Sequence, residues 1–407
     1  MAQSTEIPSF VSPDRASPRR PLGSRVLVAL AFVLGATAAP WLGLSVDATE
    51  TFASASSDDA LARRRYVVRR IMEELVAPDE IGVEGPLERG EYALATYAMA
   101  AYAVAQIALD APGTREESRS VLERIIAQLQ TARIRRFDTV QWGEDPLDSL
   151  GADRGHAAYL GQLNLVLGAY RAIGGDGRHD LLHQEVTEAI ARRMRARPHR
   201  HFETYPGETY TMDNVVAAAS LVVADRVRGG DHAALVAEYV AYTRERLLDP
   251  SSGLVVFALD NLTGEPVGRA RGSGAGWLGY FLPMVDGRFA QEQFQALRAS
   301  LVERVGPFAG VREYQLDDPG AGFGDTDSGP VLGWGVSATG FAVAGARVHG
   351  DETLYSALLS SIELAGITVD DASERRYLSA SLLGDAVILA MKTARPWWEP
   401  SASAAAE

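Results

Sequence analysis

The chain has 407 residues, of which 47% are hydrophobic and 23% are charged, a composition typical of a folded globular protein rather than a disordered one. Its formal net charge of −14 argues against a nucleic-acid-binding protein, because contacts to phosphates need a basic surface. The absence of cysteine excludes disulfides, thiolate metal ligands and cysteine nucleophiles.

The N-terminal segment has the order of a membrane-targeting sequence. Residues 1–25 are polar and carry four arginines, and residues 26–46 then contain no charge. This order is typical of a cleaved signal peptide or of an uncleaved signal anchor. The small residues 36–38 offer a cleavage site, whereas the uncharged run is long enough, at about 20 residues, to span a bilayer. Both alternatives predict an extracytoplasmic domain, periplasmic or secreted, and the second anchors it to the inner membrane.

The rest of the chain is predicted to hold one domain. Residues 47–58 are rich in Ser, Thr, Ala and Asp and are interpreted as a linker. No Pro- or Gly-rich linker divides the chain after it, so residues 59–395 are interpreted as a single unit. Residues 396–407 end in Ser and Ala and are predicted to be a disordered tail.

Within residues 59–395, charged amphipathic helical stretches alternate with almost uncharged ones about six times. An amphipathic helix buries one stripe, whereas a helix that is apolar all round must be buried on every side. The pattern therefore predicts an all-α domain, an (α/α)6 toroid of six helical hairpins. The predicted inner helices are residues 92–109, 157–173, 215–224, 274–285, 331–348 and 378–391. The clearest outer helices are residues 59–76, 115–130, 231–248 and 290–305.

Two segments need separate interpretation. Residues 92–109 are apolar enough for a second membrane span, but their equivalents recur at fairly even intervals, each beside an amphipathic partner. This recurrence favours a buried core helix.

Residues 253–259 are the one convincing strand run, and residues 261–264 supply a turn after it.

The loops predict a binding face. Those that lead from inner to outer helices are short, whereas most that lead from outer to inner helices are long and hold aromatic, acidic and Gly residues. Long ordered loops are usually functional. We therefore expect a cleft on the face formed by residues 131–155, 198–214, 249–273 and 306–330.

The loop at residues 201–214 carries the richest chemistry. It supplies Tyr205, Glu208, Tyr210 and Asp213 at the start of an inner helix. Carboxylates beside aromatic walls suit acid/base catalysis, because partial desolvation raises a carboxyl pKa towards neutrality. We predict Glu208 and Asp213 as the acid/base pair. The alternatives are that Asp213 caps its helix and that Glu208 is a solvated loop residue.

Further polar and aromatic residues are predicted to bind the substrate. Gln162 lies one turn into an inner helix, and His156 precedes that helix as either a general base or a structural histidine. Asp325 and Asp327 resemble the start of a calcium loop, but position twelve is Val336 rather than Glu, so no metal and no cofactor is predicted. The predicted substrate-binding residues are Trp142, His156, Gln162, Tyr205, Tyr210 and Asp327.

Several segments occur together in an order that carries a family resemblance. They are residues 142–145 (Trp-Gly-Glu-Asp), 159–170, 205–206 with 213–214, 244–250 and 326–327. With them, the chain resembles the linalool dehydratase/isomerase family over roughly residues 61–391. The resemblance implies an (α/α)6 fold and lyase or isomerase chemistry on a hydroxylated small molecule.

The departures from the family fall on the predicted site. Gln162 stands where the family's terpene enzyme has a histidine, and Leu259 stands where it has a tyrosine. Thr204 and Asp213 align with its two active-site cysteines. Terpene dehydration is therefore not carried over, and Glu208 and Asp213 are predicted as replacements.

Two other functions stay open. One is carbohydrate processing of the glycoside hydrolase kind, and the other is a non-catalytic binding protein with a degenerate site. The expected partners are a small-molecule substrate, no nucleic acid, and the membrane if the N-terminal segment is retained. A homo-oligomer is left open.

Overall fold

The computed structural model describes residues 48–73, 76, 85–319 and 333–397. The predicted targeting segments at residues 1–25 and 26–46 lie outside these ranges, as do Asp325, Asp327 and most of the predicted tail.

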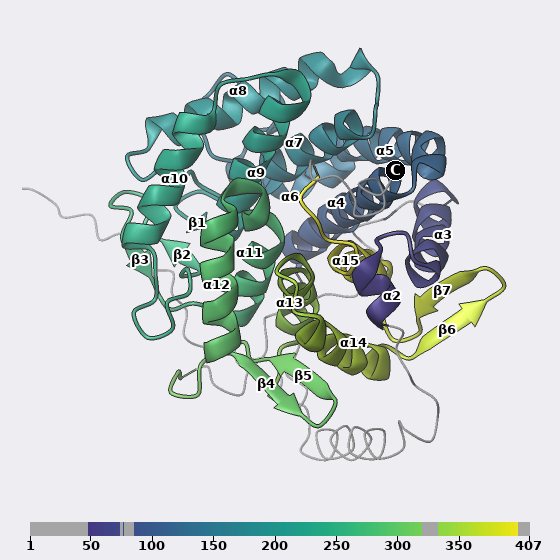
Figure 1. The fold of residues 1–407 in the computed structure, drawn as a ribbon. Coiled ribbons are helices and arrows are strands. Elements are labelled where there is room, and N and C mark those ends of the chain that lie inside the picture. The colour runs from purple at the N-terminus through teal and green to yellow at the C-terminus, as the bar shows by residue number, and fades with distance from the viewer. Residues whose placement is uncertain (1–47, 74–75, 77–84, 320–332, 398–407) are drawn as a thin grey trace, which may run out of the picture.

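Six apolar helices form a closed ring (Figure 1). Each contacts the next along the chain, and the last returns to contact the first. Their side chains are buried on almost every side, as expected for helices with no charged face. The inner helices are α4 (Pro86–Asp110), α7 (Ala157–Ala172), α9 (Thr211–Arg228), α11 (Gly272–Val285), α13 (Val336–Val348) and α15 (Leu382–Lys392).

An outer layer of amphipathic helices surrounds this ring, and each packs on an inner helix (Figure 1). Two of them begin directly after short turns, where Asp286 and Asp351 accept hydrogen bonds from the backbone N–H three residues on. The predicted alternation of inner and outer helices is confirmed. The outer helices are α3 (Asp58–Glu73), α5 (Arg115–Leu129), α8 (Asp180–Ala196), α10 (Ala233–Arg246), α12 (Gly287–Ser300) and α14 (Glu352–Gly366).

α4 is, among the described residues, the one helix that is long and apolar enough to span a bilayer. It instead contacts α5, α7 and α15 and buries 83% of its most apolar 18-residue window. The prediction of a core helix at residues 92–109 is therefore confirmed.

Several boundaries differ from the sequence prediction. Residues 132–142, expected within a loop, form α6 (Ala132–Trp142), and residues 48–53 of the expected linker form α2 (Ala48–Ala53), which packs on α14. The inner helix expected from residue 378 begins at Leu382, because Ser381 caps it by accepting from the backbone N–H of Gly384. Two short 3-10 turns, η2 (Pro112–Thr114) and η3 (Gly177–His179), precede α5 and α8.

The expectation of one strand run is wrong. The helix expected to reach residue 305 ends at Ser300, and a hairpin follows, turning at Gly306, whose φ is +59°. Such a left-handed angle suits glycine, and Pro307 after it favours a turn. The two hairpins are β4 (Val302–Val305) with β5 (Phe308–Val311), and β6 (Thr368–Asp371) with β7 (Glu374–Tyr377). The expected run itself contributes β2 (Ala258–Leu259), between β1 (Thr209–Tyr210) and β3 (Pro266–Val267) in a small antiparallel sheet.

The described parts of the loops before α7, α9, α11 and α13 contact one another on one face of the ring, which we call the long-loop face. β1, before α9, pairs with β2, before α11. The backbone N–H of Ala157, at the start of α7, donates to the carbonyl of Glu203 in the loop before α9. In the same way, the backbone N–H of Gly272, at the start of α11, donates to the carbonyl of Glu313 in the loop before α13. The convergence predicted from loop lengths is therefore observed for these four loops, and the cleft expected on this face stays a prediction.

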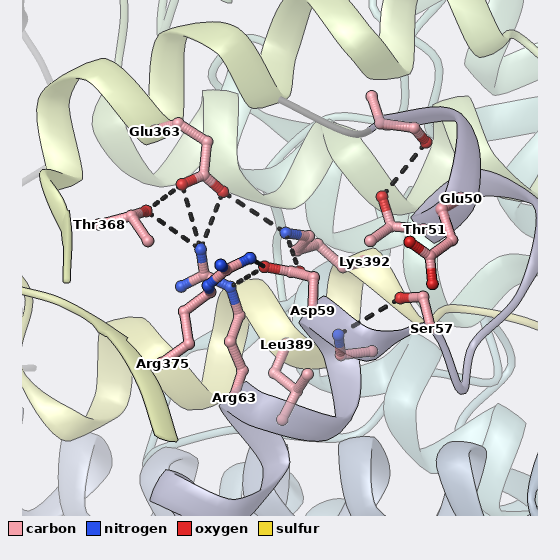
Figure 2. Close-up of polar contacts among 12 residues, drawn as sticks. Glu50, Thr51, Ser57, Asp59, Arg63, Glu363, Thr368, Arg375, Leu389 and Lys392 are labelled. Atoms are coloured by element: carbon pink, nitrogen blue, oxygen red, sulfur yellow. Dashed lines mark hydrogen bonds and ion pairs between the residues drawn. The ribbon is translucent and has the colours of Figure 1, made fainter. Parts of the chain in front are cut away.

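A buried ion cluster joins the first outer helix to the last elements of the chain (Figure 2). Arg63 of α3 bonds Asp59 and Glu363, each at 3.0 Å, so α3 is tied to α14. Lys392, at the end of α15, lies 2.5 Å from the second oxygen of Asp59 and 3.4 Å from Glu363. Arg375 of β7 completes the cluster at 3.1 Å from Asp59. These contacts close the outer layer where the two ends of the domain meet.

Candidate active site

A tight turn shapes the loop that leads into α9. Tyr205 and Glu208 exchange backbone hydrogen bonds across Pro206 and Gly207, and Gly207 has φ of +81°. Proline at the second position and a left-handed glycine at the third are the residues that a type II turn requires. The turn buries Tyr205 and leaves Glu208 exposed.

Asn214 fastens this loop to α9. Its side-chain oxygen accepts from the backbone N–H of Phe202 at 2.9 Å, and its amide donates to the carbonyls of Phe202 and Tyr210 at 3.0 and 2.8 Å. The residue at the N-cap position is Tyr210, and its side chain makes no capping bond. Asp213 therefore does not cap α9, and its carboxylate is available for other contacts.

Asp213 is a partly buried carboxylate in the first turn of α9. Burial raises the pKa of Asp213 to about 6. The hydrogen bond that Asp213 accepts from the Thr204 hydroxyl at 2.9 Å acts in the opposite direction and lowers the pKa. The nearby carboxylate of Asp138 raises the pKa further. Asp213 therefore titrates close to neutrality, as a group that moves protons must.

Glu91, which was not among the residues predicted from the sequence, is the second carboxylate of this kind. It projects from the second turn of α4 and accepts a hydrogen bond from the hydroxyl of Tyr205. Burial raises its pKa to about 7, and the charges of Asp213, Glu88 and Glu208 add to the shift, while the Tyr205 bond opposes it. Burial and the Glu91 charge keep the pKa of Tyr205 well above its usual value, so this hydroxyl stays a donor.

Glu208 and Tyr210 lie on the solvent side of the same turn. Glu208 is exposed, and its carboxylate accepts from the Tyr210 hydroxyl at 2.6 Å. Of the predicted pair, the structure thus places Asp213 inside the long-loop face and Glu208 at its rim. Glu91 takes the inner position beside Tyr205.

Trp142 and His156 stand behind the loop. The Trp142 indole N–H donates to the carbonyl of Thr204 at 3.3 Å, and its ring lies 4.7 Å from that of His156. His156 is fully buried between Asp138, 2.5 Å from its Nδ1, and Ser149, 3.1 Å from its Nε2. This arrangement links α6, α7 and the intervening loop, and it favours the structural alternative for His156.

Gln162 lies in the second turn of α7, where its side-chain oxygen accepts from the buried hydroxyl of Tyr102 at 2.6 Å. Asp327, the remaining predicted residue, falls outside the described ranges. Within those ranges, no group of three or more His, Asp or Glu side chains is arranged to hold a metal ion.

The raised pKa of Glu91 predicts a stability cost at alkaline pH. A carboxyl whose folded pKa is about 7, against an ordinary 4.5, stabilises the fold fully below pH 4.5 and loses that contribution as pH rises through 7. Glu91→Gln cannot ionise, so it should exceed the wild type in free energy of unfolding by about 1–3 kcal/mol at pH 8 and match it at pH 4.5. Urea unfolding at the two pH values measures this difference.

The matched control is Glu88→Gln, an exposed carboxylate one turn earlier on α4. It should change the unfolding free energy little at either pH. Equal stability of Glu91→Gln and wild type at pH 8 would show that Glu91 is ionised without penalty.

Comparison with known proteins identifies the family. A family model described as linalool dehydratase/isomerase matches residues 157–379, more than half of the chain. The chain belongs to the linalool dehydratase/isomerase family. The match runs from α7 to β7 and includes Gln162, Tyr205 and Asp213, whereas Glu91 precedes it.

Solved structures are similar in fold. An unsaturated glucuronyl hydrolase specific for heparin matches with a TM-score of 0.50 and 11% identity, over 83% of this chain and 96% of that one. The unsaturated glucuronyl hydrolase of Bacillus sp. GL1 matches at 0.47 and 12%, over 72% and 84%. A GH76 alpha-mannanase from Bacteroides thetaiotaomicron matches at 0.46 and 13%, over 81% and 94%. The first of these supports the toroid fold and carries no information on substrate.

Thr204 and Asp213, which the sequence resemblance places at the positions of the family's two cysteines, are hydrogen-bonded to each other. A hydroxyl and a carboxylate with a raised pKa therefore occupy the place where the resemblance puts two thiols.

Proposed function

We propose that this protein is an extracytoplasmic enzyme that performs lyase or isomerase chemistry on a hydroxylated small molecule, with Glu91 and Asp213 as its acid/base pair. The observation that carries the proposal is the pair of raised pKa values, about 7 and about 6, on two partly buried carboxylates of one face. Membership of the linalool dehydratase/isomerase family supports the reaction class. The extracytoplasmic location rests on the basic and then uncharged order of residues 1–46.

The two carboxyl groups suit the two halves of a dehydration. Between pH 6 and 7, Glu91 holds its proton while Asp213 is mostly ionised. Glu91 donates its proton to the substrate hydroxyl, and the C–O bond breaks to release water. Asp213 takes a proton from the adjacent carbon, and the electron pair of that C–H bond becomes the new C=C bond. The reverse addition of water at another carbon of an allylic system gives isomerisation.

Tyr205 and Thr204 hold the pair in place. Tyr205 donates to Glu91 and Thr204 donates to Asp213, so adjacent residues of one loop orient both carboxyl groups. The type II turn and Asn214 fix that loop, which makes the arrangement pre-organised rather than formed on binding.

A panel of tertiary and allylic alcohols tests the proposal. We expect one or more to yield an alkene or a rearranged alcohol, detected by gas chromatography, with a rate that peaks between pH 6 and 7. In D₂O, recovered substrate should gain deuterium at the carbon next to the hydroxyl-bearing one. Absence of turnover across the panel, with release of reducing sugar from oligosaccharides, would favour the carbohydrate-processing alternative.

A further inference from the structure

The residues before the first outer helix are folded onto the domain. Residues 47–58 were interpreted as a linker, yet α2 packs on α14, and the rings of Phe52 and Tyr355 meet edge to face at a centroid distance of 5.3 Å (Figure 1). The residues here with an exposed fraction of 4% or less are Ala48, Thr51, Ala55 and Ser57. This part of the expected linker therefore belongs to the folded domain.

Polar contacts bind α2 and the turn after it to the ends of inner helices. Asp110, the last residue of α4, accepts from the Ser54 hydroxyl at 2.9 Å. It also accepts from the backbone N–H and the hydroxyl of Ser56, at 3.0 and 2.8 Å. Arg395, which follows α15, lies 3.2 Å from the other oxygen of Asp110. In the last turn of α13, Arg347 donates to a backbone carbonyl of α2. The segment is thus bonded where α4, α13 and α15 end.

These helix ends lie on the face of the ring opposite the candidate active site. We call it the short-loop face, after the turns that follow five of the inner helices, residues 111–114, 173–179, 229–232, 286 and 349–351. Asp213 lies in the first turn of α9, and α9 ends at Arg228 on the short-loop face. At about 1.5 Å of rise per residue, the Asp213 carboxylate is about 20–25 Å from that face.

The predicted membrane segment precedes α2 directly. The uncharged run at residues 26–46, outside the described ranges, ends two residues before Ala48. A helix of that length would cross about 30 Å, the thickness of the hydrocarbon core. Two extended residues cover only about 7 Å. A flexible linker at residues 47–58 would instead reach about 20 Å and let the domain rotate. The bonds of α2 therefore remove the slack between the predicted anchor and the domain.

Surface charge gives the membrane little hold on this face. The formal net charge of the chain is −14, which disfavours attraction to anionic lipids. Two exposed arginines of the short-loop face already have acidic partners: Arg178 lies 2.7 Å from Asp176, and Arg288 lies 3.3 Å from Glu292. The short connection to α2, rather than charge, is therefore the feature that can orient the domain.

We propose that α2 holds the short-loop face against the membrane and turns the long-loop face, with Glu91 and Asp213, towards the extracytoplasmic aqueous space. This inference rests on the proposed function, because it takes the site and the location from it, and it adds that residues 26–46 are retained as an anchor. It also names the source of the substrate. The site receives a small molecule from the aqueous compartment, and not a lipid that diffuses within the bilayer.

Single cysteines test this orientation, because the chain itself has none to interfere with labelling. Gly113→Cys places a dye on the short-loop face, at an exposed position with free space around the new Cβ. Leu262→Cys places one on the long-loop face, where the native side chain is 82% exposed. The full chain is reconstituted in phosphatidylcholine vesicles that carry an acceptor lipid, and energy transfer reports the distance from each dye to the bilayer. We expect the dye at position 113 to lie about 20–25 Å nearer.

An inserted linker tests whether α2 sets this orientation. About 12 flexible Gly and Ser residues between residues 47 and 48 restore the slack, so the difference between the two dye distances should disappear. The matched control is the same insertion between Ala372 and Ser373, in the exposed turn of the β6–β7 hairpin, which leaves the connection to α2 intact. This control should keep the difference.

Three results would overturn the proposal. The first is equal distances for the two dyes, or a nearer dye at position 262. The second is a full chain that does not remain with the vesicles on flotation, since no anchor is then retained. The third is a difference that survives the linker before α2. Replacing part of the lipid with anionic phosphatidylglycerol should leave both distances unchanged, and a reversal would assign the orientation to charge instead. Failure of the proposed function appears separately, as absent alcohol turnover by a chain whose dye distances are as expected.

Discussion

Replacement of Asp213 with Asn is expected to lower the turnover of a reactive alcohol by about 10²–10⁴-fold, the usual contribution of one general acid or base. The amide keeps the shape of the side chain and still accepts from Thr204, but it cannot take up a proton. Glu91→Gln should cause a loss of similar size. Because the two groups act in one step, the double variant should lose little more than the worse single one.

Two carboxylates of the same region serve as comparisons. Asp148→Asn, at an exposed position in the loop before α7, should leave the rate unchanged. Glu208→Gln should cost less than tenfold, because Glu208 is exposed and bonded to Tyr210 at the rim. A larger loss for Glu208→Gln than for Glu91→Gln would restore Glu208 as the partner of Asp213. A folded and fully active Asp213→Asn would end the acid/base assignment of that residue.

The ring of helices was predictable because burial directly restricts which residues a helix can contain. A helix enclosed by neighbours on every side cannot carry charges without losing their hydration. The uncharged run at residues 92–109 and the almost uncharged run at residues 157–173, whose one charge is Arg171 near its end, therefore identified α4 and α7. The hairpins β4–β5 and β6–β7 have a weaker sequence signal than the buried helices. Their strands have four residues each; β4, β6 and β7 carry charged side chains, and β5 (Phe-Ala-Gly-Val) is too short to show an apolar alternation.

The candidate site was predictable only in part. Asp213 could be selected because it opens an inner helix within an aromatic loop, but Glu91 lies about 120 residues away and meets that loop only through the closed ring. A local signal for Glu91 existed: it is the acid that directly precedes the uncharged run of α4. The burial of His156 against Asp138 left no such signal, because their contact joins two separate elements.

The closing ion cluster predicts a large loss of stability. Lys392, the only lysine of the chain, is 1% exposed and bonds both Asp59 and Glu363. Lys392→Met keeps the length of the side chain but leaves two carboxylates short of a charge partner. Removing one partner of a buried ion pair typically costs about 3–5 kcal/mol. We expect a decrease of this size in the free energy of unfolding at pH 7, measured with urea.

The pH dependence of the free energy of unfolding distinguishes the effect of the charges in this cluster from the effect of lost packing. Lys392 and Arg63, against the effect of burial, hold the pKa values of Asp59 and Glu363 below their ordinary 3.8 and 4.5. Groups with lowered pKa values stabilise the fold fully above about pH 4.5 and lose that contribution as pH falls. The difference between wild type and Lys392→Met should therefore be constant from pH 5 to 8 and shrink below pH 4. Arg178→Met, which breaks exposed pairs with Asp176 and Glu123, should lower the free energy of unfolding far less than Lys392→Met does, because exposed ion pairs are screened by water. A difference for Lys392→Met that persists unchanged at pH 3 would assign its cost to lost packing of the lysine chain rather than to the charges that join α3, α14 and α15.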